Sequence, residues 1–341
     1  MEHVAIDLGS SKSQVCVRSA TGELLHEARV PTLDLSAFLR SRAPSRVVLE
    51  TCAESFRVAD AARQAGHEVR VVPATLVRQL GVGQRGIKTD KRDARALSEA
   101  SCRVDLPSVH IRSQLSRDRL SRLGMRHALV TARTQLVNTV RGWMRTELTK
   151  VRSSTACFPA NVRKALVDRP EGMPVYVEHV LTSIDTLTAQ IAEADAELEK
   201  LTKEHEVCRL LRSVPGVGPV TSMAFVAVVD DVQRFTTAAG LESYLGLTPG
   251  ENSSSNRVRR TAITKAGPAL LRHTMTQAAL TLWRVRPLDP ACLWADRVKA
   301  RRGSGIAIVA LARKLAGILW AMWRTGTPYD PQRAATPAPA Q

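Results

Sequence analysis

The chain has 341 residues and a formal net charge of +17, because 49 Lys and Arg residues outnumber 32 Asp and Glu residues. This length predicts two domains rather than one oversized core. The six cysteines are scattered singly, which argues against a disulfide framework and a cysteine-type zinc site. The excess of arginine predicts a polyanionic partner, of which nucleic acid is the first candidate.

Targeting segments are not expected from the sequence. The most apolar stretch, residues 306–323, is interrupted by Arg313 and Lys314. A membrane span needs roughly 18 to 20 consecutive apolar residues. Glu2 and Asp7 lie where a secretory signal would be basic or apolar. These features predict a soluble, cytoplasmic, nucleoid-associated protein with no membrane partner.

The first hundred residues alternate between strand and helix patterns. The predicted strands are 4–17, 24–30, 47–49 and 69–72, and the predicted helices are 33–42, 54–65 and 90–102. An opening hairpin followed by alternating strands and helices is typical of a RuvC-like, ribonuclease H-like α/β domain. A doubly wound dinucleotide fold would need a glycine fingerprint after the first strand, which is missing here.

The rest of the chain is predicted to be mostly helical. Two long helical patterns flank a break at residues 152–174, as in an antiparallel helical hairpin or coiled-coil arm. Such arms commonly dimerise, so a homo-oligomer (dimer or tetramer) is expected, although an arm that acts only as a spacer has the same pattern. Residues 251–330 carry fourteen Lys and Arg against four Asp and Glu. The expected division is a RuvC-like domain (1–110), a helical arm (111–205), a basic helical C-terminal domain (206–330) and a disordered tail (331–341).

Four carboxylates are candidate metal ligands. Asp7 lies in the first predicted strand, Glu50 ends another, and Asp90 and Asp93 stand three apart on one face of a predicted helix. If these acids gather, divalent cations must neutralise them, and Mg²⁺ suits oxygen-only ligands near phosphates. Two Mg²⁺ ions, which Mn²⁺ could replace, would activate an attacking group and stabilise the leaving oxygen of a phosphodiester.

Each acid has a structural alternative when it is taken singly. Asp90 and Asp93 could be residues of a helix N-terminus or surface ion-pair partners, and Glu50 a solvated acid at a strand end. Asp7 also opens an Asp-Leu-Gly-Ser-Ser segment similar to the first phosphate loop of actin-like and sugar-kinase ATPases. Those proteins need a second Asp-x-Gly-x-Thr/Ser loop downstream, and the sequence has none.

Two sets of motifs resemble one protein family. Asp7, Glu50 and the segment Lys88-Thr-Asp-Lys-Arg-Asp93 resemble the DEDD signature of insertion-sequence transposases whose N-terminal domain is RuvC-like. The segments 214–218, 244–249 and 263–267 resemble the C-terminal transposase domain of the same family, so the likeness runs from residue 4 to about residue 329. It implies a DNA transposase or recombinase of a mobile element that cuts and exchanges strands. Some members are guided by a structured bridge RNA.

The resemblance also implies a serine nucleophile that becomes linked to DNA. The candidates lie in the polar segment 252–256, next to Arg257, Arg259 and Arg260, which could hold a phosphodiester. The family has Ser-Gly where this chain has Ser254-Ser255, so the register is open: Ser254 is favoured, Ser253 is second and Ser255 third.

Other candidate residues would contact nucleic acid. The Pro-Gly-Val-Gly turn with Gly216 and Gly218 resembles a helix-hairpin-helix element, whose backbone N–H groups bind a phosphate. Lys265, Arg301 and Arg302 are further phosphate-contact candidates. The expected partners are double-stranded DNA, at the element ends and the target, and a structured guide RNA.

Two other functions remain open at this stage. A Holliday-junction-type endonuclease would use metal-activated water and need no serine. A non-catalytic nucleic-acid-binding protein would use the basic surface alone, and its carboxylates would be structural.

Overall fold

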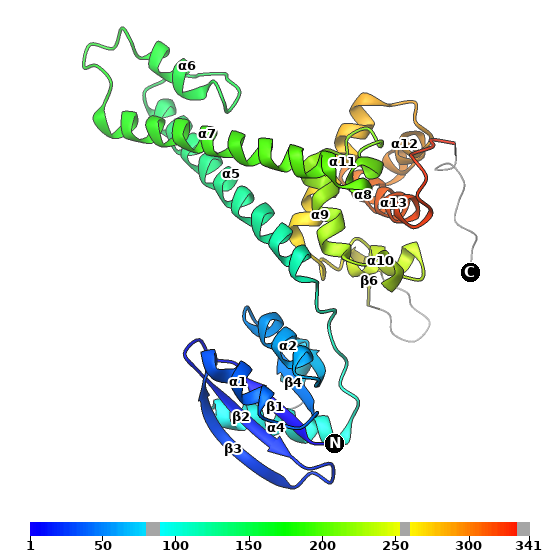
Figure 1. Cartoon of the computed structure of the whole chain (residues 1–341). Coiled ribbons are helices and arrows are strands. Elements are labelled where there is room, and N and C mark those ends of the chain that lie inside the picture. Colours follow the sequence, from blue (N-terminus) through cyan, green and yellow to red (C-terminus); the bar gives the residue numbers. More distant parts are fainter. Residues whose placement is uncertain (80–88, 253–259, 333–341) are drawn as a thin grey trace. The chain divides into compact units, whose positions relative to one another are not determined.

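The computed structural model of the chain describes residues 1–79, 89–252 and 260–332. It divides into two compact units: an N-terminal unit, Met1–Arg112, and a C-terminal unit that begins at Ser113 (Figure 1). Each unit has its own hydrophobic clusters, so each is described by itself.

The N-terminal unit is built on one five-stranded mixed sheet with the order β3-β2-β1-β4-β5. Its strands are β1 (His3–Asp7), β2 (Lys12–Arg18), β3 (Leu24–Pro31), β4 (Arg46–Glu50) and β5 (Glu68–Val72). The first three strands pair antiparallel, and β4 and β5 run parallel to β1. This mixed α/β architecture confirms the predicted fold class for this part of the chain and is compatible with a RuvC-like domain.

The predicted single strand over residues 4–17 is wrong, because the chain reverses between β1 and β2 at Gly9. Hydrogen bonds hold this turn, since the Thr32 hydroxyl donates to the Gly9 carbonyl at 2.7 Å and the Gly9 N–H donates to Ser13 Oγ at 3.3 Å. A side chain at residue 9 would collide with the Lys12 carbonyl oxygen. The Gly-Ser-Ser run is the turn signal that identifies the reversal.

Helices cover both faces of the sheet. The helical segments of this unit are η1 (Thr32–Asp34), α1 (Leu35–Arg40), α2 (Ser55–Gln64), α3 (Ala74–Gln79) and α4 (Asp90–Arg103). Residues of α1 and α2 share a buried cluster with Val4, Ile6 and Leu49. Leu97 of α4 shares a different cluster with Ala5. Alternate residues of β1 therefore face opposite layers, as the strand period of two requires.

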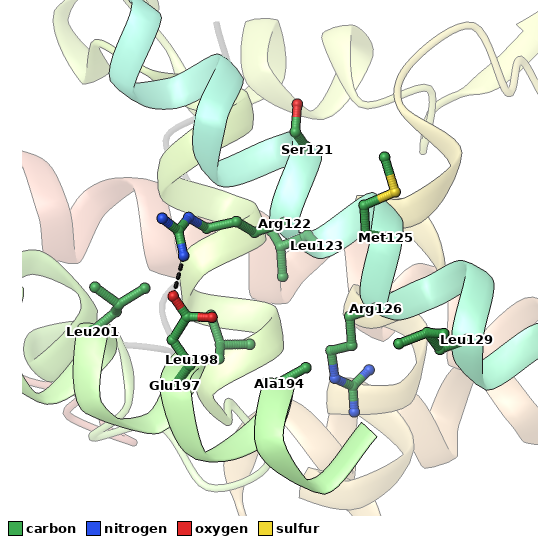
Figure 2. Close-up of a pocket in the computed structure, with 10 residues that line it drawn as sticks. All are labelled: Ser121, Arg122, Leu123, Met125, Arg126, Leu129, Ala194, Glu197, Leu198 and Leu201. Atoms are coloured by element: carbon green, nitrogen blue, oxygen red, sulfur yellow. Dashed lines mark hydrogen bonds and ion pairs between the residues drawn. The ribbon is translucent and has the colours of Figure 1, made fainter. Parts of the chain in front are cut away.

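Two long helices open the C-terminal unit, α5 (Gln114–Thr146) and α7 (Val175–Glu204), which pack against each other. Figure 2 shows Arg122 of α5 reaching towards Glu197 of α7, beside a groove of about 330 Å³ between the helices. Between them lies α6 (Phe158–Ala165), a helix inside the stretch predicted to be a break. It forms because Phe158 and Val162 are fully buried against α7.

Shorter helices complete the C-terminal unit. They are α8 (Glu206–Leu211), α9 (Pro219–Val229), η2 (Val232–Arg234), α10 (Ala238–Tyr244), α11 (Ala269–Val285), α12 (Pro290–Arg302) and α13 (Ser304–Thr325), with a two-stranded hairpin of β6 (Pro249–Glu251) and β7 (Arg260–Ile263). Nine of the eleven residues of α9 are buried, because this helix packs in the core against α5, α7, α8 and α11.

Helix α13 contains the most apolar stretch of the chain, residues 306–323. It is long and apolar enough to cross a membrane by length and composition, even though it contains Arg313 and Lys314. Its buried residues, among them Leu311, Leu315 and Leu319, belong to the core shared with α10, α11 and α12. Packing in this core is therefore a sufficient physical reason for its apolar composition.

Candidate metal centre and nucleic-acid interface

Two of the predicted carboxylates end neighbouring parallel strands. Asp7 is the last residue of β1 and Glu50 the last residue of β4. The register pairs Ile6 with Leu49, so the two acids follow side by side at one edge of the sheet. Neighbouring strands lie about 4.8 Å apart, which puts the two backbones close together. Both side chains are half-buried.

The same two carboxylates share a face of the sheet. Ala5 and Val48 belong to the cluster that contains Leu97 of α4. Side chains two residues apart on a strand point the same way, so Asp7 follows Ala5 and Glu50 follows Val48 towards the layer of α4.

Helix α4 runs antiparallel to β1 and carries Asp93 towards this edge. The Ser101 hydroxyl lies 2.8 Å from His3 Nδ1, near the start of β1, and Leu97 packs beside Ala5. Four helical residues rise about 6 Å and two strand residues about 6.6 Å. One further turn along the helix therefore brings Asp93 to the level of Asp7. Asp93 is only 5% exposed, which is unusual for a carboxylate.

Asp90 has a different environment from Asp93, although the spacing of three puts both near one face. It is the first residue of α4 and is exposed. Thr89 caps the helix by accepting a hydrogen bond from the Arg92 N–H.

Glu50 is followed by a tight turn in which the Ser55 hydroxyl donates to the Cys52 carbonyl at 2.9 Å. Burial raises the pKa of the Cys52 thiol, so this neighbour is a packing group rather than a reactive one.

The described residues contain no group of three or more His, Cys, Asp or Glu side chains placed to hold a metal ion. The backbone thus brings Asp7, Glu50 and Asp93 to one edge and one face of the sheet, but the side chains do not form a closed ligand set. The chemistry of the donors, carboxylate oxygens only, fits Mg²⁺ or Mn²⁺.

The serine candidates fall outside the described residues, as do Arg257 and Arg259. The structure describes the hairpin on either side of them. β6 and β7 pair Pro249 with Ile263 and Glu251 with Arg260. The segment that contains Ser253 and Ser254 therefore connects the two strands of this hairpin.

Two glycines hold the base of the hairpin. Gly246 has a φ of +67°, and a Cβ there would lie 2.6 Å from the Ala266 nitrogen. A Cβ on Gly267 would lie 2.6 Å from the Leu245 carbonyl carbon. The motifs Tyr-Leu-Gly and Lys-Ala-Gly are thus two backbone segments that cross in contact, where only glycine fits. The sequence contained the signal for this crossing, the paired glycines on either side of the polar segment.

The predicted helix-hairpin-helix turn connects α8 to α9. Gly216 has a φ of +93°, and a Cβ there would lie 2.6 Å from the Ala278 carbonyl oxygen of α11. Gly218 is the N-cap of α9, and a Cβ there would meet nothing within 4 Å. Gly216 is therefore required by packing, whereas the position of Gly218 has room for a side chain.

The other predicted phosphate contacts lie on the surface of the C-terminal unit. Lys265 is exposed and has a left-handed backbone with a φ of +56°. Arg301 and Arg302 are exposed in the last turn of α12, next to Lys299. Cations stabilise this end of a helix. Arg260 is the first residue of β7.

Comparison with known families agrees with the order of these elements. A DEDD transposase model of the IS110 type matches residues 4–147. A second model, described as a transposase of the IS116/IS110/IS902 family, matches residues 208–291. The first match contains Asp7, Glu50, Asp90 and Asp93. The second contains the β6–β7 hairpin and the turn between α8 and α9.

Curated relatives align over nearly the whole chain. A probable family 20 transposase of Pseudomonas aeruginosa is 27% identical over 338 residues, which cover 97% of this chain and 99% of the relative. The transposase for insertion sequence element IS1111A of Coxiella burnetii is 27% identical and covers 94% and 88%, respectively. The transposase for insertion sequence element IS1328 of Yersinia enterocolitica is 26% identical and covers 96% and 98%.

Proposed function

Because the chain belongs to the DEDD-type, IS110/IS116 family of insertion-sequence transposases, which cleave and transfer DNA strands, we propose that it moves its own element by Mg²⁺-dependent strand exchange through a serine nucleophile. The metal part of this proposal is supported by the register of β1 and β4, which end at Asp7 and Glu50, and by the burial of Asp93.

The carboxylates would hold Mg²⁺ at the scissile phosphate. Asp7 and Glu50 come from adjacent strand ends, Asp93 comes from the helix above them, and exposed Asp90 completes the set when substrate is bound. Two divalent ions supply charge neutralisation at the attacking and leaving oxygens of a phosphodiester. The half-buried position of Asp7 and Glu50 keeps their oxygens oriented and partly shielded from water.

The nucleophile in this proposal is Ser254, with Ser253 as the second candidate. The serine Oγ attacks phosphorus and loses its proton, a phosphoserine ester forms, and the deoxyribose oxygen leaves and takes up a proton. One phosphoester bond breaks as another forms, so the strand can be rejoined to a new partner without an energy source. The glycine crossing at the base of the hairpin supports this role, because it gives the serine segment a rigid base.

DNA would be held by the basic C-terminal unit. Gly218, which precedes α9, would contribute its backbone N–H, and Lys265, Arg301 and Arg302 would supply exposed cations. A structured guide RNA and assembly into a dimer or tetramer belong to the same proposal. The net charge of +17 supports a polyanionic partner.

The test is a cleavage assay on supercoiled DNA that carries the element ends. We expect Asp7→Asn and Asp93→Asn to reduce cleavage at least 100-fold, as removal of a catalytic electrostatic group does, while DNA binding in a gel-shift assay stays near that of wild type. Ser254→Ala should abolish the covalent protein–DNA adduct on a denaturing gel, and Ser253→Ala is the comparison that sets the register.

Two results would contradict parts of this proposal. Full cleavage by both Asp variants would contradict the proposed metal site. Mg²⁺-dependent cleavage without any adduct would instead indicate a junction-type nuclease that uses water. Sequencing of RNA that co-purifies with the chain tests the guide.

A further inference from the structure

Helix α4 is held at its first two turns by an acid on the edge strand of the sheet. Glu27 of β3 forms ion pairs with Lys91, at 2.8 Å, and with Arg95 Nε, at 2.6 Å. The Glu27 side chain is only 14% exposed. Arg95 also donates through its second nitrogen to the other oxygen of Glu27, at 2.9 Å. The hydrogen bond from Arg95 holds the pKa of this carboxyl below its usual range.

The contact belongs to a row of residues that runs across the sheet beneath α4. Strand pairing aligns Ala5 with Cys16 and Cys16 with Glu27, so their side chains share one face. Leu97 packs beside Ala5, the Ser98 hydroxyl lies 3.2 Å from Cys16 Sγ, and Arg95 holds Glu27. The helix therefore touches this row from β1 outwards to β3.

Asp93 lies on the opposite flank of the helix from this clamp. At 100° per residue, Asp93 is about 160° around the axis from both Lys91 and Arg95 and only about 40° from Leu97. Leu97 packs towards β4 and β5, against Val48 and Val72. Because both flanks belong to one helix, fixing Lys91 and Arg95 to β3 also fixes the rotation of Asp93 about the helix axis.

We propose that Glu27 is a positioning residue for the metal ligands: by clamping Lys91 and Arg95 it sets the roll of α4 and hence the direction in which Asp93 faces Asp7 and Glu50. It also keeps two cations on the far flank, away from the site where divalent ions bind. This inference rests on the proposed metal function of the carboxylates.

Direct binding of Mn²⁺ alone to the full-length chain, measured by calorimetry, tests the role of Glu27. We expect Glu27→Gln to weaken Mn²⁺ binding about tenfold, as loss of a group that orients a ligand does. Glu27→Asp, which keeps the charge, should restore most of this loss. In cleavage assays Glu27→Gln should need about tenfold more Mg²⁺ for half-maximal rate, with a maximal rate close to that of wild type.

A matched control comes from β5, the edge strand on the opposite side of the sheet from β3. Glu68 of β5 also holds two arginines, Arg46 and Arg70, at 3.2 and 3.0 Å, but it lies at the amino end of its strand. Glu68→Gln should leave Mn²⁺ binding unchanged. If Glu68→Gln weakens binding as much as Glu27→Gln does, a general loss of ion pairs explains the effect and the positioning role is wrong.

Asp7→Asn, run in parallel, separates the two proposals. If it loses Mn²⁺ binding while Glu27→Gln binds as wild type does, the metal site stands and the role of Glu27 is overturned. If Asp7→Asn binds Mn²⁺ normally, the metal site fails and the inference fails with it. Should Glu27→Gln not fold by circular dichroism, Arg95→Gln replaces it, with the same weakening expected and unchanged binding again counting against the clamp.

Discussion

At the scale of single residues, glycine and buried carboxylate explain most of what the motifs do. Gly246 and Gly267 allow two backbone segments to touch, and Gly216 allows a turn to press on α11. Asp93 is 5% exposed although burial of a carboxylate is costly. In the proposed function, this residue is one of the ligands of the divalent ion.

The glycine crossing leads to a prediction on stability. Gly267→Ala and Gly246→Ala should each lower the free energy of unfolding by about 1 to 3 kcal/mol, because the added methyl group has no space. Gly124→Ala is the matched control: it lies within α5 with nothing within 4 Å of its Cβ position. That change should stabilise the chain by about 0.5 to 1 kcal/mol. Urea unfolding followed by circular dichroism measures the unfolding free energy of all three variants. Equal changes in the three would contradict the close backbone contact at Gly246 and Gly267.

At the scale of elements, strand ends and helix flanks determine which side chains meet. β1 and β4 end together because they are parallel and in register, and α4 crosses antiparallel to β1. In the C-terminal unit, α5 and α7 are joined by exposed ion pairs as well as by apolar contacts. Burial of apolar surface is the larger stabilising term, because water screens exposed charges.

A pair of substitutions separates these two terms. Leu181→Ala in α7, where the leucine is fully buried, should cost about 2 to 5 kcal/mol of unfolding free energy. Arg122→Ala removes the ion pair with Glu197, in which both side chains are 57% exposed, and should cost less than about 1 kcal/mol. Denaturant titration of the two variants gives both values. A larger loss from Arg122→Ala than from Leu181→Ala would mean that charge pairing holds the helices.

At the scale of the whole molecule, the two units have separate cores. The buried clusters of the N-terminal unit contain residues of the sheet and its helices, and those of the C-terminal unit contain residues from α5 onwards. A unit with its own core can fold by itself. The proposed cleavage and DNA-binding roles of the two units can therefore be tested on separate fragments.

Separate cores predict separate unfolding. Differential scanning calorimetry of the full chain should show two transitions, and a fragment of residues 1–112 should fold with circular dichroism typical of mixed helix and strand. One of the two transitions should keep its midpoint in this fragment. A single cooperative transition together with an unfolded fragment would show that the units depend on each other for stability.

The sequence alone identified the candidate residues of the chain and its family resemblance. Acids at apolar strand ends, glycines around a polar segment and an excess of arginine are local features, and each identifies its residues without knowledge of the fold. The α/β class and the long helices followed from hydrophobic periodicity, which is also a local property.

Only the tertiary structure decided how these residues are combined. The helix α6 and the burial of α13 depend on packing partners far away in the chain, which periodicity cannot show. The same holds for Glu27, an acid with no motif around it. Its contact with α4 exists because strand pairing carries it across the sheet to Lys91 and Arg95, 64 and 68 residues further along the chain.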